Sequence, residues 1–207
     1  SCYLWKIAVT FVSNIQSKEL YSTDFGDWTD RDATKGEVVA EEATTKYSRE
    51  PLTFTVYNTL VGSDAATVAG SQWSKFSDYP ITGGALQAQK NGGSYIVTSP
   101  LASVSKVTFV HGATGGNRGW SLWAKGDGDA DWVQITTSVA NPAGYCEVVA
   151  QVNRTNCQLK FTNLVDAQNA YMFSLSIEGN VDMSKYPALG KFSYNGVTYT
   201  AADIFDE

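Results

Sequence analysis

The sequence predicts an all-β protein built as a two-sheet β-sandwich of the jelly-roll class. Candidate strands recur about every ten residues, separated by clusters of Gly, Asp, Asn, Ser or Pro, which favour turns. Few segments show the 3.6-residue period of a helix. The 207 residues include 6 Trp, 11 Tyr and 9 Phe, which is enough for one such domain with a sizeable core.

The expected strands follow one another along the chain. In order, they are Glu19–Phe25, Glu37–Tyr47, Leu52–Leu60, Ala85–Gln89, Ser94–Thr98, Lys106–His111, Gly119–Lys125, Trp132–Ser138, Glu147–Val152, Cys157–Thr162 and Tyr171–Glu178. Upstream, Ile7, Val9 and Phe11 alternate on one face, which favours an edge strand; a remnant of a secretion signal is the alternative. Cys2 fits either a lipoprotein anchor or a chance cysteine.

The clearest single element is a hairpin within Gly115–Ile135. Trp120 stands on its first arm and Trp132 opens the second, and the turn Gly126–Asp131 consists almost entirely of Gly and Asp. We interpret Trp120 and Trp132, together with Trp28, as core or rim residues rather than ligand contacts.

The carboxylates of this turn resemble the opening of an EF-hand loop. Asp127, Asp129 and Asp131 alternate as that motif requires, but its glycine position is Trp132 and its bidentate acid position is Ser138. We therefore expect an exposed acidic turn and no metal site. A structural Ca²⁺ held partly by carbonyl groups is the alternative.

The segment VNRTNC predicts a second hairpin, with its turn centred on Arg154 and Asn153 paired with Asn156. In that register Cys146 and Cys157 lie too far apart for a disulfide, so we expect both to be free and to pack as small core residues. Arg154 is expected to brace the turn.

Two stretches depart from the strand pattern. Val61–Gly84 is the longest irregular segment, and irregular segments of this length tend to be binding loops or disordered. After Asn180 the sequence turns linker-like and then predicts a hairpin around Asn195-Gly196. We therefore expect a sandwich domain over residues 1–180, followed by a linker and hairpin over 181–207 that could begin another module.

Charge and residue types exclude several functions. The net charge of −6 argues against a nucleic-acid partner, and no segment is long and apolar enough to span a membrane. His111 is the single histidine, and we expect it at a strand end, bonded to a loop carbonyl. We expect no catalytic residues, no cofactor and no metal motif of Cys and His.

Several motifs in one order resemble a known family. The block GGNRGWSLWAKGDGDADWVQI is similar to the hairpin of galactose-binding-like β-sandwiches. Together with YSTDFGDWTD, SPLASVSKVTFVHGATGGNRGW and VNRTNCQLKFTN, it resembles the amino-terminal domain of secreted pectate-lyase-like proteins from gut Bacteroidetes, from about Leu20 onward. The resemblance implies a secreted or cell-surface bacterial protein whose lyase chemistry belongs to a different, β-helical domain.

Sugar recognition needs flat apolar rings beside planar polar groups. The chain offers Trp73, Phe76 and Tyr79 in the long irregular segment, and Asn117 and Arg118 before Trp120. These five residues are the expected ligand-binding site. The function we expect is a non-catalytic, accessory carbohydrate-binding module for a plant polysaccharide or oligosaccharide, with pectin first. The alternative is a structural module that docks a neighbouring catalytic domain.

Overall fold

A computed structural model describes the chain in segments. The described residues are 15–28, 45–49, 52–76, 78, 81, 83–91, 93–115, 117–140, 144–165, 167–182, 192–194 and 197–199. The expectations for the apolar run before residue 12 and for Cys2, the first part of the strand expected at Glu37–Tyr47, and Tyr79 lie outside them. The chain divides into two compact units, one of Glu19–Gly179 and one of Ser1–Lys18 with Asn180–Glu207.

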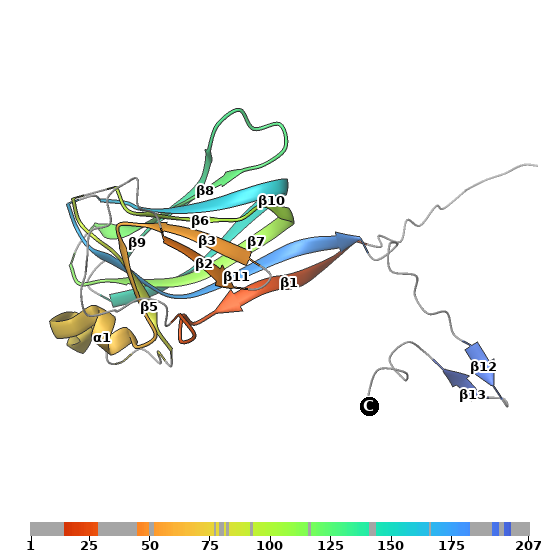
Figure 1. Cartoon of the computed structure of the whole chain (residues 1–207), viewed down its shortest axis with the longest axis horizontal. Helices are drawn as coiled ribbons and strands as arrows, with labels where there is room; N and C mark the ends of the chain where they lie inside the picture. Colours follow the sequence, from red (N-terminus) through yellow and green to blue (C-terminus); the bar gives the residue numbers. More distant parts are fainter. Residues whose placement is uncertain are drawn as a thin grey trace, which may run out of the picture. The chain divides into compact units, whose positions relative to one another are not determined.

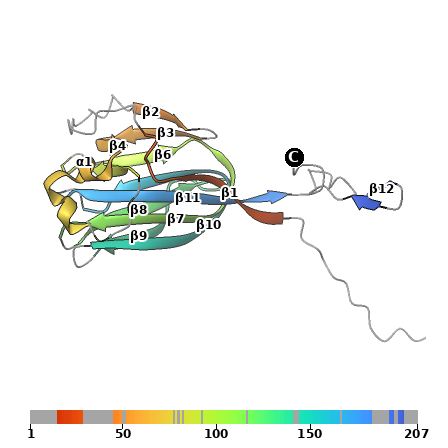
Figure 2. The ribbon, with the colours of Figure 1, turned by 90° about the horizontal axis from the view of Figure 1, so that it is seen from below.

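The larger unit is a two-sheet β-sandwich, as the sequence predicts (Figure 1). One layer, sheet A, contains β4 (Thr59–Gly62), β5 (Ala85–Ala88), β11 (Ala170–Asp182), β7 (Leu101–Ala113) and the first part of β10 (Gly144–Asn163), and β1 (Ile15–Thr23) pairs with β11. The other layer, sheet B, contains β2 (Thr45–Arg49), β3 (Leu52–Tyr57), β6 (Tyr95–Thr98), the second part of β10, β8 (Arg118–Lys125) and β9 (Val133–Ala140). Figure 2 shows the layers from below.

The long strand β10 corrects the hairpin predicted at VNRTNC. The chain does not turn back at Arg154; it continues as one strand that leaves sheet A and enters sheet B, with a register shift between Gln151 and Arg154. Asn153 and Asn156 have positive φ values of 51° and 44°, which Asn tolerates better than most residues. A strand commonly bends at such a bulge where it passes from one sheet to another.

The same strand explains why its cysteines are free. Cys146 and Cys157 lie far apart along β10, and at about 3.3 Å per residue they are well beyond the roughly 7 Å that a disulfide allows between Cα atoms. Both are free, as predicted, although the predicted register was wrong. Cys157 is buried in the core, whereas Cys146 is only partly buried.

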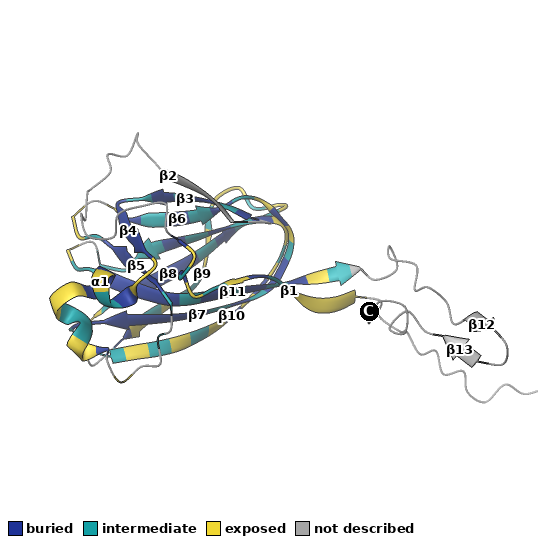
Figure 3. Cartoon of the chain, turned by 60° about the horizontal axis from the view of Figure 1, so that its bottom comes forward, coloured by how far each residue is buried: buried dark blue, intermediate teal, exposed yellow. Residues whose placement is uncertain are grey.

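The main core fills the space between the sheets. Its largest side chains include Trp28, Phe54, Phe109, Trp120 and Phe161, each 0% exposed. Buried residues alternate with more exposed ones along the strands, so each sheet turns one face inward and the other outward (Figure 3). The core positions of Trp28 and Trp120 confirm their expected packing role.

The segment expected to be irregular contains two short helices. Asp64 accepts hydrogen bonds from the amides of Ala66 and Thr67 and so caps α1 (Ala65–Ala69), which continues into the 3₁₀-helix η1 (Gly70–Lys75). A second hydrophobic cluster joins these helices to β5, β7 and β11. Gly112 on β7 permits this close packing, because a Cβ there would lie 2.8 Å from the rings of Phe76 and Phe173.

The smaller unit contains a two-stranded hairpin. Strands β12 (Phe192–Tyr194) and β13 (Val197–Tyr199) pair antiparallel, with Tyr194 opposite Val197. This confirms the hairpin predicted around Asn195-Gly196, although the turn itself lies outside the described residues. The domain boundary expected near residue 180 stays a prediction.

Candidate ligand-binding site

A polar pocket of about 440 Å³ lies where several loops meet at one end of the sandwich. The loops that contribute follow β5, β7 and β10, and η1 completes the wall. Its lining combines ammonium, guanidinium, amide and hydroxyl groups: Gln72, Lys75, Lys90, Thr114, Arg118, Ala167, Gln168, Asn169 and Tyr171. The volume lies within the usual range of small-molecule sites, roughly 300–1,000 Å³.

The three-residue period of η1 determines which of its side chains face the pocket and which face the core. Residues three apart eclipse one another in a 3₁₀-helix. Gln72 and Lys75 are so spaced, and both line the pocket. Trp73 and the C-cap residue Phe76 form the neighbouring stripe, and both belong to the cluster packed against sheet A.

Two of the expected ligand-binding aromatics therefore have packing positions. Phe76 is 1% exposed, and its ring meets those of Tyr171 and Phe173 edge-on, with centroids 5.2 and 5.3 Å away. Trp73 is half-buried against the same cluster and is not among the pocket residues. We therefore assign both rings to packing and replace them in the site by their neighbours Gln72 and Lys75.

Arg118 and Asn117 have different positions in the site. Asn117 is exposed with φ 59°, so it provides a left-handed turn residue before β8 and does not line the pocket. Arg118 begins β8 and lines the pocket. Its Nη1 donates a hydrogen bond to Thr114 Oγ1, while its buried Nε has no partner among the described residues. The contact with Thr114 thus orients the guanidinium, whose Nε is buried.

Lys75 is fixed near the same turn. Its Nζ donates to the carbonyl oxygen of Thr114 at 2.8 Å. Thr114 therefore accepts hydrogen bonds from both Lys75 and Arg118, which brings η1 and the start of β8 together.

The opposite wall depends on a pairing that the sequence pattern does not reveal. Ala88 of β5 is the partner of Ala170 of β11, which sets Lys90 beside Asn169. The Lys90 amide donates to Asn169 Oδ1 at 2.9 Å. Sequence reasoning missed Lys90, Gln168 and Asn169, because their proximity arises from long-range strand pairing.

The described lining of the pocket carries positive charge. None of the described lining residues is acidic, and no carboxylate in the same part of the chain forms an ion pair with Lys75, Lys90 or Arg118. Burial raises the pKa of Tyr171, with Arg118 acting in the opposite direction, so its hydroxyl stays protonated at neutral pH. The site can hold an anion with charged and neutral hydrogen-bond donors.

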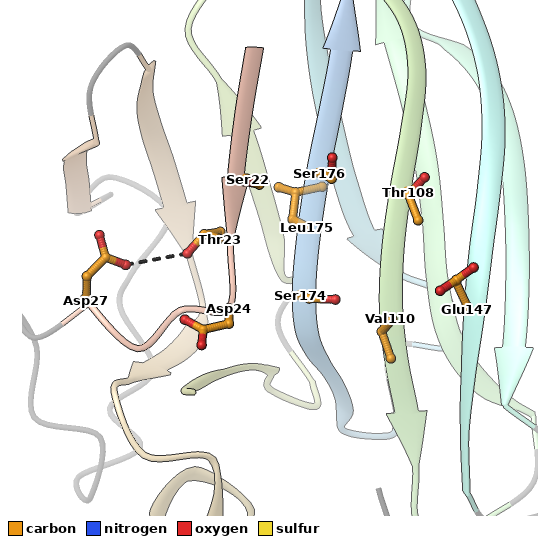
Figure 4. A pocket seen from close by; sticks show the side chains of 10 residues that line it. All are labelled: Ser22, Thr23, Asp24, Asp27, Thr108, Val110, Glu147, Ser174, Leu175 and Ser176. Carbon is orange, nitrogen blue, oxygen red and sulfur yellow. Dashed lines mark hydrogen bonds between the residues drawn. The ribbon is translucent and has the colours of Figure 1, made fainter. Parts of the chain in front are cut away.

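A second, larger hollow lies on the outer face of sheet A. It measures about 560 Å³ and is lined by Ser22, Thr23, Asp24, Asp27, Thr108, Val110, Glu147, Ser174, Leu175 and Ser176 (Figure 4). Thr23 donates a hydrogen bond to Asp27 at 3.4 Å. Among its described lining residues the ionisable ones are all acidic and none is aromatic, so it is unsuited to an anionic sugar.

His111 differs from its expected position at the end of a strand. It is buried within β7, and its Nε2 lies 2.7 Å from Ser138 Oγ and 2.8 Å from Cys146 Sγ. Burial lowers its pKa to about 4, so the imidazole is neutral at neutral pH. Nδ1 has no hydrogen-bond partner among the described residues, so no carboxylate orients the ring as it does in a serine-hydrolase triad.

The acidic turn between β8 and β9 is joined to the bulge of β10. Arg154 Nε donates to Asp129 Oδ2 at 3.1 Å, and the Gly126 amide donates to the same oxygen at 2.9 Å. Asn156 Nδ2 donates to Asp127 Oδ2 at 2.6 Å. Arg154 thus braces this turn, and both carboxylates have protein partners.

The described residues contain neither a metal-binding cluster nor a membrane-spanning helix. No group of three or more His, Cys, Asp and Glu in this part of the chain could hold a metal ion. No helix in the same part is long and apolar enough to cross a membrane.

Comparison with known proteins gives structural likenesses only. No family model and no curated protein matches the sequence. The K1 cleaved adhesin domain of Lys-gingipain from Porphyromonas gingivalis W83 has a TM-score of 0.45 and 11% identity, over 81% of this chain and 99% of that one. A family 29 carbohydrate-binding module from Piromyces equi has a TM-score of 0.44 and 8% identity, over 80% and 91%.

A third similar structure is the CBM22-1 xylan-binding domain from Paenibacillus barcinonensis. Its TM-score is 0.42 and its identity 12%, over 80% of this chain and 96% of that one. Such distant matches assign neither a ligand nor a site to this chain.

Proposed function

We propose that this domain is a non-catalytic module that binds an acidic plant polysaccharide, with pectin first, through the pocket lined by Lys75, Lys90 and Arg118. The observation that carries this proposal is the lining itself, whose described residues provide cations and amides and include no acid. A uronate presents a planar carboxylate and several hydroxyl groups. The pocket provides donors for both.

Arg118 is the residue best suited to the carboxylate. A guanidinium can donate two parallel hydrogen bonds to one carboxylate, and such charge-assisted bonds are roughly twice as strong as neutral ones. The contact with Thr114 already orients this side chain, so less conformational entropy is lost on binding. The amides of Gln168 and Asn169 are then available to ring hydroxyls.

The protein's overall charge of −6 does not oppose this local recognition. Net charge governs long-range steering, whereas affinity at short range depends on the groups that touch the ligand. The acidic hollow on sheet A would repel the same ligand, so we expect an acidic sugar to bind at the basic pocket. An exported protein and a neighbouring catalytic domain are parts of this proposal.

Calorimetric titration with trigalacturonate and its methyl ester tests the pocket. We expect Arg118→Ala to weaken trigalacturonate binding by roughly ten- to a hundredfold, because a charge-assisted contact worth about 1.5–3 kcal/mol is lost. The methyl ester should bind weakly to the wild type and respond little to the substitution. Lys106→Met is a matched control, because Lys106 pairs with Glu178 and is not among the pocket residues.

The outcomes separate the two functional classes. Selective loss of trigalacturonate binding in the Arg118 variant supports the proposal. Unchanged affinity in a folded Arg118 variant rejects this pocket. No sugar binding by the wild type rejects carbohydrate recognition and favours the docking module.

A further inference from the structure

The outer face of sheet B carries a group of partly exposed aromatic rings. Tyr57 of β3 pairs with Tyr95 of β6, and their ring centroids lie 5.1 Å apart. Trp123 of β8 is on the same face, because its indole Nε1 donates to Thr162 Oγ1 at 3.0 Å and Thr162 is the neighbour of Tyr95. All three rings are half-buried, whereas their neighbours along each strand point into the core.

A lysine occupies the middle of this face. Lys160 of β10 is the strand partner of Trp123, and its Nζ lies 5.2 Å from the centroid of the Tyr95 ring and 5.6 Å from that of Trp132. These cation–π contacts hold the ammonium group above the rings. Lys160 and Trp132 are both partly exposed. We call Tyr57, Tyr95, Trp123, Trp132 and Lys160 the sheet B aromatic face.

We propose that the sheet B aromatic face is a second carbohydrate-binding surface, which takes pyranose rings of a uronate-containing chain by stacking and pairs Lys160 with a carboxylate. This inference rests on the proposed function, since it assigns the same ligand class to a second surface. Aromatic faces contact the apolar C–H side of a pyranose, and the central ammonium complements its negative charge.

The face is separate from the basic pocket in sequence and in the fold. Its residues come from β3, β6, β8 and β10 and from the residue before β9, and none of them lines the pocket. The hydroxyl of Thr162 lies beside Trp123, and the ammonium of Lys160 lies over Tyr95 and Trp132, so both can serve as polar partners for sugar hydroxyls. The domain would then bind two segments of polyuronate.

The test is the stoichiometry of trigalacturonate binding, measured by calorimetry together with tryptophan fluorescence. Wild-type protein should bind two molecules. Lys160→Met should weaken one of the sites about tenfold, since it removes a charge-assisted contact while the aliphatic stem stays. Tyr95→Ala should also weaken that site alone. Tyr145→Ala is the matched control, because it removes a half-exposed tyrosine from the sheet A part of β10.

The results distinguish this inference from the proposed function. One site in the wild type, lost with Arg118→Ala and unaffected by Lys160→Met and Tyr95→Ala, overturns the aromatic face and leaves the pocket intact. One site lost only with Lys160→Met supports the face and rejects the pocket. Absence of any binding overturns both.

Discussion

Replacement of Phe76 separates a packing role from a ligand-binding role. Its ring is 1% exposed and lies edge-on to Tyr171 and Phe173. Loss of a buried Phe side chain commonly costs about 3–5 kcal/mol, so we expect Phe76→Ala to lower the free energy of unfolding by that amount. Phe76→Leu keeps most of the apolar volume but loses two aromatic contacts of about 0.5–1.5 kcal/mol each, which predicts a loss of about 1–3 kcal/mol.

Urea unfolding followed by tryptophan fluorescence measures both values. Trp73→Ala is the matched comparison, because Trp73 belongs to the same cluster but is only partly buried, and we expect a smaller loss of stability. In the folded Phe76→Leu variant, trigalacturonate affinity should change little. A loss below about 1 kcal/mol in Phe76→Ala, combined with a large loss of sugar affinity, would refute the packing role.

Three further outcomes concern charge and cysteine chemistry. A hydrogen bond from the Gly126 amide lowers the pKa of the Asp129 carboxyl in the folded protein. The ionised carboxylate therefore stabilises the fold above the unfolded pKa of 3.8, and this stabilisation is lost as the pH falls through the folded pKa. Asp129→Asn should lower the melting temperature at pH 7 and make it less dependent on acid pH. The pKa of His111 is about 4 in the folded protein and 6.5 in the unfolded chain, so the unfolded chain takes up a proton first as the pH falls. The free energy of unfolding should therefore decrease by up to about 3 kcal/mol between pH 6.5 and pH 4. In urea titrations, His111→Asn should abolish this pH dependence. Burial raises the pKa of the Cys157 thiol to about 11, so this cysteine should react slowly with alkylating reagents. Peptide mapping after alkylation of the native protein should find Cys146 labelled, and Cys157 labelled only after unfolding. Labelling of Cys157 in the native protein would contradict its burial.

The strand pattern was sufficient for the sandwich but not for the course of β10. Asn residues with positive φ occur both in two-residue turns and in bulges, so Asn153 and Asn156 alone could not distinguish a hairpin from a bent strand. The apolar alternation along β10 does distinguish them. Its buried positions are even-numbered up to Val152 and odd-numbered from Cys157. Such a change of phase within one apolar alternation indicates an extra residue.

The sequence predicted a site residue only where that residue lies close to a recognisable motif. Arg118 stood out beside the hairpin, and it does line the pocket. The choice of Trp73 and Phe76 followed their aromatic character, whereas the structure turns that stripe inward and sets Gln72 and Lys75 on the pocket side. Lys90 and Asn169 become neighbours only through the β5–β11 register, which no local pattern encodes.

The central claim is that the basic pocket receives a carboxylate, and the most direct measurement is a ¹H–¹⁵N NMR titration of the protein with trigalacturonate. The Arg118 Nε–H group belongs to the guanidinium that lines the pocket, so its resonance should shift when a carboxylate binds there. We expect shifts at Arg118 and at the amides of Lys90 and Asn169 that saturate together and disappear with the methyl ester. Saturable shifts around Glu147 and Ser174, with the Arg118 resonance unchanged, would contradict the account.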